Sequence, residues 1–198
     1  MPAISDIPET ELPATDLPTV VSDSELTNSF LSETIQVCVV SRDYKRAMEG
    51  MVRLGIGPWR VYHYHDAPGL KDTIYRGEDE NFKMTLCIAW TGAMQWEIVE
   101  PLEGRTIYDD FLDEHGEGIH HVAFAGRDQG DSEMPYDDQI AEFAKRGFPV
   151  IQSGLIKEIS KFHYFDTERA TSTTFEIYNL KGRDLPEPDE WYPGRPPK

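Results

Sequence analysis

Four polar residues lie within short apolar, strand-like segments of the sequence: Gln36, Glu97, His121 and Glu176. A glutamine oxygen, an imidazole nitrogen and two carboxylates together form a mixed oxygen and nitrogen donor set for a divalent metal ion. Because this set contains no thiolate, it favours Zn²⁺, Ni²⁺, Co²⁺, Mn²⁺ or Fe²⁺. The two carboxylates bring a bound dication close to neutral, so that it could still accept a substrate oxygen.

An internal repeat connects these four residues. The segment IQVCVVSRD aligns with HHVAFAGRD, which places Gln36 on His121, and WEI aligns with FEI, which places Glu97 on Glu176. Taken singly, a glutamate on a strand more often faces solvent, and a single histidine is usually just hydrogen-bonded. A duplicated module, however, usually packs around a pseudo-twofold axis, so the equivalent strands should face one cleft. The coincidence therefore favours one metal site over four unrelated residues.

Two adjacent histidines in GEGIHHVAF pose a choice, because neighbours on a strand point to opposite faces. His121 is the repeat partner of Gln36, so it should face the cleft. His120 should point away, into hydrogen bonds between the sheet and its helix layer.

The elements that must position these residues follow the order βαβββ twice, which indicates an α+β fold. Asp43 can cap a first helix that Gly55 ends, and Thr106 with Asp109 resembles a capping box for a short helix ending near residue 116. The pattern predicts strands at about 34–40, 59–65, 83–90, 94–99, 120–126, 149–157, 161–165 and 173–180, and a second helix ending at Gly147.

A second pair of histidines, His63 and His65, shares one face of a strand, while Tyr62 and Tyr64 share the other. If the histidines face the cleft, one of them could donate a proton to a reaction intermediate near neutral pH; the alternative is an ordinary surface pair. The loop that follows is either a lid or a hairpin connection. Aromatic residues that could line a cleft for a bulky, partly apolar substrate include Trp59, Trp90, Trp96, Tyr75, Phe82, Phe165 and Tyr178.

Composition limits the function classes. A formal net charge of −17 opposes binding to nucleic acid along an extended surface. No apolar run approaches the roughly 18 residues of a membrane span, and the N-terminus does not resemble a signal peptide. Cys38 and Cys87 lie in strand-like runs, which indicates buried thiols and a cytoplasmic protein. We expect a flexible arm at 1–30, a domain at 31–180 with modules at about 33–100 and 118–180, and a proline-rich tail at 181–198.

The segment WEIVEPLEGRTIYDDFLDEHGEGIHHVAF resembles the epimerase-like branch of the vicinal oxygen chelate superfamily, which contains glyoxalase I, methylmalonyl-CoA epimerase, extradiol dioxygenases and bleomycin-resistance proteins. The resemblance covers about residues 33–180. It implies that the paired modules form an incomplete barrel around a metal held by Gln36, Glu97, His121 and Glu176. Gln36 stands where the epimerases and dioxygenases have histidine, and the resulting set resembles that of eukaryotic zinc-type glyoxalase I.

The resemblance also implies a chemistry. A small-molecule carbonyl substrate chelates the metal, and a carboxylate removes the α-proton through an enediolate-type intermediate. By analogy Glu176 is the base and Glu97 the second candidate. The expected function is a metal-dependent isomerase, epimerase or lyase acting on a CoA-linked, thiol-linked or specialised-metabolite substrate, in a chain that could form a homodimer. The alternatives are a non-catalytic ligand-binding protein and, with less support because a second histidine ligand is missing, an extradiol-type dioxygenase.

Overall fold

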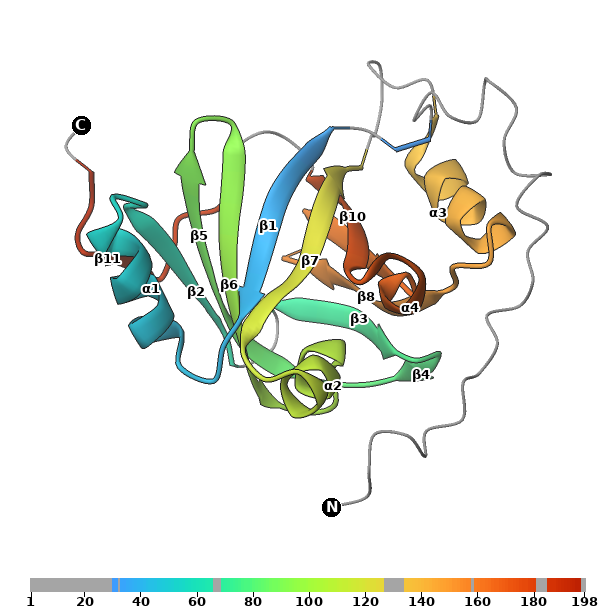
Figure 1. Ribbon diagram of the computed structural model, residues 1–198, viewed down its shortest axis with the longest axis horizontal. Coiled ribbons are helices and arrows are strands. Elements are labelled where there is room, and N and C mark those ends of the chain that lie inside the picture. The colour runs from blue at the N-terminus through green and yellow to red at the C-terminus, as the bar shows by residue number, and fades with distance from the viewer. Residues whose placement is uncertain are drawn as a thin grey trace.

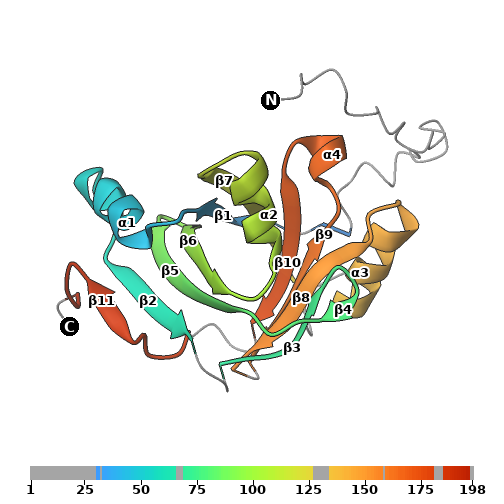
Figure 2. The ribbon, with the colours of Figure 1, turned by 90° about the horizontal axis from the view of Figure 1, so that it is seen from below.

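One curled sheet dominates the computed structural model, which describes residues 30–31, 33–65, 69–126, 134–157, 159–180 and 185–196. The sheet has 11 strands, in the order β11-β2-β5-β6-β1-β7-β10-β9-β8-β3-β4. It bends into an open half-barrel (Figures 1 and 2), which confirms the predicted α+β fold.

The predicted βαβββ repeat is present. The first module contains β1 (Thr34–Val40), α1 (Tyr44–Arg53), β2 (Trp59–Tyr64), β5 (Lys83–Thr91) and β6 (Met94–Glu103). After α2 (Ile107–Glu114), the second module contains β7 (Gly118–Ala125), α3 (Tyr136–Lys145), β8 (Val150–Ile156), β9 (Ser160–Phe165) and β10 (Thr174–Leu180). The two predicted caps form, since Asp43 accepts from the Arg46 amide and Thr106 accepts from the Asp109 amide.

The two modules meet at the middle of the sheet. Strands β1 and β7 pair antiparallel there, and each pairs parallel with the last strand of its own module, β6 and β10 respectively. This arrangement has the pseudo-twofold relation that the sequence repeat predicts. It brings the first and last strands of both modules, with their polar residues, to the centre of the half-barrel.

The segment after His65 is neither a free lid nor a simple hairpin connection within its own module. Its strand β3 (Leu70–Tyr75) crosses to the other module and pairs with β8, and β4 (Glu78–Asp79) pairs with β3 (Figure 2). At the opposite edge, β11 (Glu190–Tyr192) pairs with β2, so the C-terminal segment docks on the first module (Figure 1). Neither pairing was predicted, nor was the short helix α4 (Glu168–Thr171).

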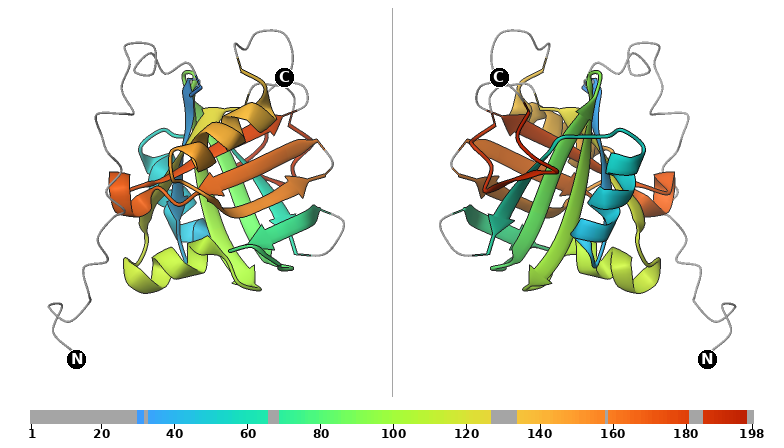
Figure 3. Two further views of the ribbon diagram at one scale, coloured as in Figure 1. Left: turned by 90° about the vertical axis from the view of Figure 1, so that its right-hand side faces the viewer. Right: turned by 90° about the vertical axis from the view of Figure 1, so that its left-hand side faces the viewer.

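Hydrophobic side chains fill both faces of the sheet. On the outer face, α1 covers a cluster around Trp59 and α3 covers one around Phe165, and the side views place each helix against its own module (Figure 3). On the inner face, tyrosine, methionine and aliphatic side chains gather with those of α2. Residues 1–29 of the predicted arm lie outside the described residues, while Phe30 packs on Phe143 of α3. None of the described helices is both long and apolar enough to cross a membrane.

Candidate functional site

The centre of the sheet carries three chemically reactive residues side by side. In the register of the strands, Cys38 on β1 pairs with Glu97 on β6 and with His121 on β7. Side chains at paired positions of neighbouring strands point to the same face of a sheet. These three side chains therefore form one row across the inner face.

The next row completes the set. Gln36 lies two residues before Cys38 on the same strand, and it pairs with Ala123 of β7. Ala123 in turn pairs with Glu176 of β10. Alternation along each strand then brings Gln36 and Glu176 to the face that already carries Glu97 and His121.

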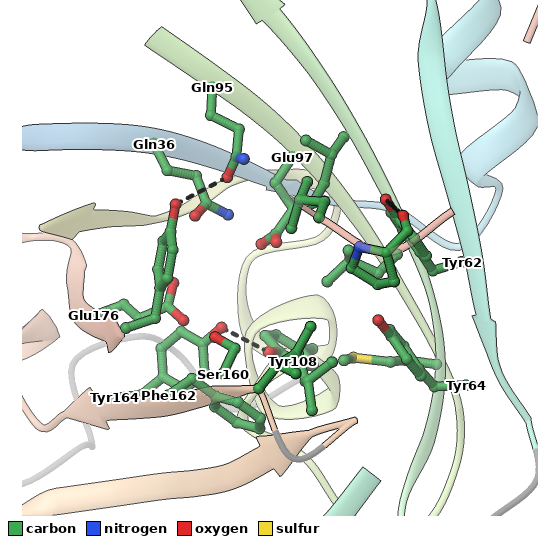
Figure 4. A pocket seen from close by; sticks show the side chains of 18 residues that line it. Gln36, Tyr62, Tyr64, Gln95, Glu97, Tyr108, Ser160, Phe162, Tyr164 and Glu176 are labelled. Carbon is green, nitrogen blue, oxygen red and sulfur yellow. Dashed lines mark hydrogen bonds between the residues drawn. The ribbon is translucent and has the colours of Figure 1, made fainter. Parts of the chain in front are cut away.

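The four predicted ligands thus meet at one place. His121 Nε2 lies 3.2 Å from Glu97 Oε2 and 3.1 Å from Glu176 Oε2. All four side chains are buried, and Gln36, Glu97 and Glu176 line the same end of a pocket (Figure 4). The distances place a single imidazole between two carboxylates.

These side chains fit a divalent metal ion. Apart from the contacts of His121 with the two carboxylates, no described residue hydrogen-bonds these buried atoms: Gln36 Nε2, Glu97 Oε2, His121 Nε2 and Glu176 Oε2. Such unsatisfied polar atoms are costly in a protein interior, and a bound cation would satisfy them. The Gln36 amide can turn its oxygen to the same place, because its two ends have nearly the same shape. Ligation by the four residues stays a prediction.

The electrostatics of the cluster also favour a bound cation. Burial by itself lowers the pKa of His121, but the carboxylates of Glu176 and Glu97 outweigh it and raise the pKa to about 9. Burial raises the pKa of Glu176, while His121 and Tyr164 oppose the increase. Protons and a metal ion would therefore compete for the same buried atoms.

Cys38 was missed as a member of the site. Its sulfur lies within 4.8 Å of a ligand atom of Glu97 and of His121. Burial and the neighbouring Glu97 carboxylate hold the pKa of the Cys38 thiol well above its usual value, so the sulfur keeps its proton. The signal was present in the sequence, because Cys38 follows Gln36 by two residues and so shares its face of the strand.

His120 does not point away from His121 as strand alternation predicts. The register between β1 and β7 shifts here, so that Cys38 pairs with His121 while the next residue, Val39, pairs with Ile119. His120 is thus the extra residue of a β-bulge, where alternation breaks down. Its Nδ1 lies 2.8 Å from the Nδ1 of His121. The prediction that His120 points away from the cleft is wrong, because its ring packs edge-on against Tyr108 and Phe111 of α2, on the same inner side of the sheet as His121.

Replacing His120 with Phe is expected to weaken Zn²⁺ affinity by about 10–100-fold, the usual effect of losing a hydrogen-bond partner of a metal-ligating histidine. If His121 ligates through Nε2, its proton resides on Nδ1 and is donated to His120 Nδ1. Competition with a chromophoric chelator measures the affinity. His163→Phe is the matched control, since His163 is a partly buried histidine that bonds Tyr136 outside the site. Equal Zn²⁺ affinity in the wild type and the His120 variant would contradict the role.

The pocket that adjoins the cluster is lined mainly by tyrosine and aliphatic side chains. Tyr62 and Tyr64 stack with their ring centroids 6.3 Å apart, and the Tyr108 hydroxyl donates to that of Tyr164 across 2.9 Å. Leu185 and Pro186 of the C-terminal segment contribute one wall, because the Tyr62 hydroxyl donates to the Pro186 carbonyl. Of the aromatic residues proposed from the sequence, Tyr178 lines the pocket; Trp59 and Phe165 lie instead in the outer-face clusters.

His63 and His65 do not line this pocket. Tyr62 and Tyr64 occupy the inner face of β2, so the two histidines lie on the opposite face, where both rings contact the hydroxyl of Thr85 at 3.4 and 3.0 Å. The condition for their role as proton donors, a position facing the cleft, is therefore not met.

The sequence matches a family model described as the Glyoxalase/Bleomycin resistance protein/Dioxygenase superfamily over residues 35–164. The chain belongs to this superfamily. The match covers the first module and the second as far as β9, with three of the four predicted ligands, and it confirms the resemblance to the vicinal oxygen chelate proteins. No curated protein matches the chain.

Solved structures share the glyoxalase fold at low identity. A hypothetical protein, BH1468 from Bacillus halodurans C-125, is 16% identical, with a TM-score of 0.54 over 78% of this chain and 98% of that one. Methylmalonyl-CoA epimerase from Mycobacterium tuberculosis is also 16% identical, with a TM-score of 0.54 over 78% and 92%. A variant of Streptomyces coelicolor methylmalonyl-CoA epimerase, in complex with 2-nitronate-propionyl-CoA, is 14% identical, with a TM-score of 0.52 over 79% and 99%.

Proposed function

We propose that this glyoxalase-superfamily protein is a metal-dependent isomerase, epimerase or lyase that removes a proton next to the carbonyl of a small molecule. The observation that carries the proposal is the pair of buried glutamates on either side of the His121 imidazole, at one end of an otherwise uncharged pocket. Two carboxylates buried this close to each other repel unless a cation or protons neutralise them.

The donor set suits the divalent ions Zn²⁺, Ni²⁺, Co²⁺, Mn²⁺ and Fe²⁺, with Gln36, Glu97, His121 and Glu176 as the ligands. When bound, such an ion supplies a Lewis acid that polarises a substrate carbonyl and makes the neighbouring proton more acidic. The thiol of Cys38 stays protonated beside the set, so it adds no further negative charge.

Glu176 is our candidate for the base. It reaches the pocket from β10, and burial raises its pKa, which brings the carboxylate closer to the basicity that proton abstraction near neutral pH requires. The pair of hydroxyls on Tyr108 and Tyr164 lies beside it and lines the same pocket. Glu97 is the second candidate because the pseudo-twofold relation makes the two glutamates nearly equivalent.

The fold neighbours named as methylmalonyl-CoA epimerases support a reaction of the epimerase type, in which a proton leaves and returns beside a thioester carbonyl. The residue at the first ligand position, Gln36, resembles instead the set in zinc-type glyoxalase I. Both are proton transfers next to a carbonyl, so the proposal stops at this shared step.

Hydrogen exchange tests the step without knowledge of the natural product. Metal-loaded protein is incubated in D₂O with a panel of α-hydroxyketones, beginning with 2-hydroxyacetophenone, and the loss of the α-proton signal is followed by NMR. We expect exchange above the buffer rate with at least one compound, and none with the metal-free protein. If compounds bind to the loaded protein and none exchanges, the protein is a ligand-binding member of the superfamily and the enzymatic proposal fails.

A further inference from the structure

We infer that the pocket selects an uncharged, ring-bearing carbonyl compound and rejects acyl-CoA thioesters and other anionic substrates. This inference rests on the proposed function only in directing the carbonyl toward the end of the pocket that holds Glu97 and Glu176. The inferred substrate differs from those named for the methylmalonyl-CoA epimerases that share the fold.

The charge of the pocket lining disfavours anions. The pocket is lined by 18 residues (Figure 4), and none of these is lysine, arginine or histidine; the charged groups among them are the carboxylates of Glu97 and Glu176. An anionic group inside the pocket would lose its hydration without gaining a cationic partner, which costs several kcal/mol for a buried ion. A neutral compound does not meet this penalty.

The aromatic and aliphatic lining of the pocket suits a planar ring. The rings of Tyr62 and Tyr64 lie nearly parallel, with an angle of 9° between their planes, and both line the pocket, where they form its aromatic wall. Met84, Leu86 and Ile88 of β5 continue the apolar lining, and Phe162 of β9 contributes from the second module. Aromatic rings pack well against another planar ring, through offset or edge-to-face contact.

Several hydroxyl groups of the pocket are already engaged in hydrogen bonds. Three of the hydroxyls that could recognise a polar substrate already have acceptors: Tyr62 donates to Pro186, Tyr108 to Tyr164, and Tyr178 to Gln95 at 3.2 Å. Most of the pocket therefore offers apolar contact, and the polar atoms that lack partners are concentrated among the four predicted ligands.

Among the described residues, two cationic side chains, Lys157 and Arg60, lie close to the pocket without lining it. The Lys157 ammonium lies 5.7 Å and 5.9 Å from the ring centres of Tyr62 and Tyr64, outside the lining, where the two rings already attract it. The Arg60 guanidinium interacts with Tyr62 and stacks on the rings of Trp90 and Trp191. Coenzyme A carries a diphosphate and a further phosphate, which is more negative charge than these two cations balance. The net charge of −17 adds a long-range repulsion of such polyanions.

A pair of matched probes tests the inference by binding alone. 4-(2-Hydroxyacetyl)benzamide and 4-(2-hydroxyacetyl)benzoate share the hydroxyketone and the ring, and they differ by one negative charge far from the carbonyl. Isothermal titration of the metal-loaded protein should show the amide binding at least tenfold more tightly, and propionyl-CoA not binding. Equal or tighter binding of the benzoate, binding of propionyl-CoA, or no binding of the amide would each overturn the inference.

A variant connects this preference to the aromatic wall. Tyr64→Leu should weaken binding of the amide by about tenfold, the value of an aromatic contact, and leave binding of hydroxyacetone, which has no ring, unchanged. Trp90→Leu is the matched control, because Trp90 is 38% exposed and lies outside the pocket lining. Equal losses for both compounds would contradict the role of the wall.

The binding result and the exchange result fail independently. Binding of the amide without hydrogen exchange would leave the substrate preference intact and remove the proposed reaction. Hydrogen exchange on propionyl-CoA would support the proposed reaction and remove the substrate preference.

Discussion

In the Glu176→Gln variant, hydrogen exchange next to a substrate carbonyl is expected to fall by about 10²–10⁴-fold, the contribution typical of a positioned general base. Glutamine keeps the length of the side chain and one oxygen ligand but cannot accept the proton. Because the side chain is buried between β7 and β9, an isosteric replacement should preserve packing. Exchange is measured by NMR in D₂O on metal-loaded protein.

Two further variants make this result specific. Glu97→Gln should reduce exchange less than Glu176→Gln does, if the second module supplies the base. Glu100→Gln is the control on β6, because Glu100 lies three residues beyond Glu97 and therefore faces the other side of the strand. Undiminished exchange in Glu176→Gln, with metal content and thermal stability retained, would remove Glu176 from the role of base and direct attention to Glu97.

The His121→Ala variant is expected to lose metal and to destabilise the metal-free protein. Without the imidazole, Glu97 and Glu176 remain buried, at 5% and 4% exposure, with no cationic partner between them. Removing one member of a buried ion pair typically costs about 3–5 kcal/mol. Urea unfolding of metal-free wild type and variant at pH 7 measures the difference in the free energy of unfolding.

His163→Ala provides the comparison for this loss. His163 is also a partly buried histidine, but its neighbour is the Tyr136 hydroxyl, and burial lowers its pKa to about 4, so it is neutral at pH 7. Its removal should cost the packing of an imidazole ring without leaving a buried charge. A His121→Ala variant no less stable than His163→Ala would show that the two glutamates are already protonated in the metal-free protein.

The sequence predicted the centre of this fold well because the information there is local and duplicated. Alternation within IQVCVV and WEI fixes which side of each strand Gln36 and Glu97 occupy, and the repeat transfers that assignment to the second module. The helix caps at Asp43 and Thr106 are likewise set by residues within one turn. These predictions did not depend on contacts between distant parts of the chain.

The remaining features depend on contacts between distant parts of the chain. Pairing of β3 with β8 joins strands about 80 residues apart, and no local pattern specifies it. The bulge at His120 follows from the register of β7 on β1 rather than from its own neighbours. The face of the sheet that forms the pocket depends on how the whole sheet curls, so the sequence could place Tyr62 and His63 on opposite faces without showing which face is inner.

The central claim is that four residues from two modules hold one metal ion, and metal content tests it most directly. Wild type and His121→Ala are purified without a histidine tag, reconstituted with Zn²⁺, Ni²⁺, Co²⁺, Mn²⁺ or Fe²⁺, and compared by elemental mass spectrometry. We predict about one equivalent of metal per chain in the wild type and its loss in the variant. Wild-type protein that retains no metal after reconstitution, or a variant that retains as much as the wild type, would contradict the account.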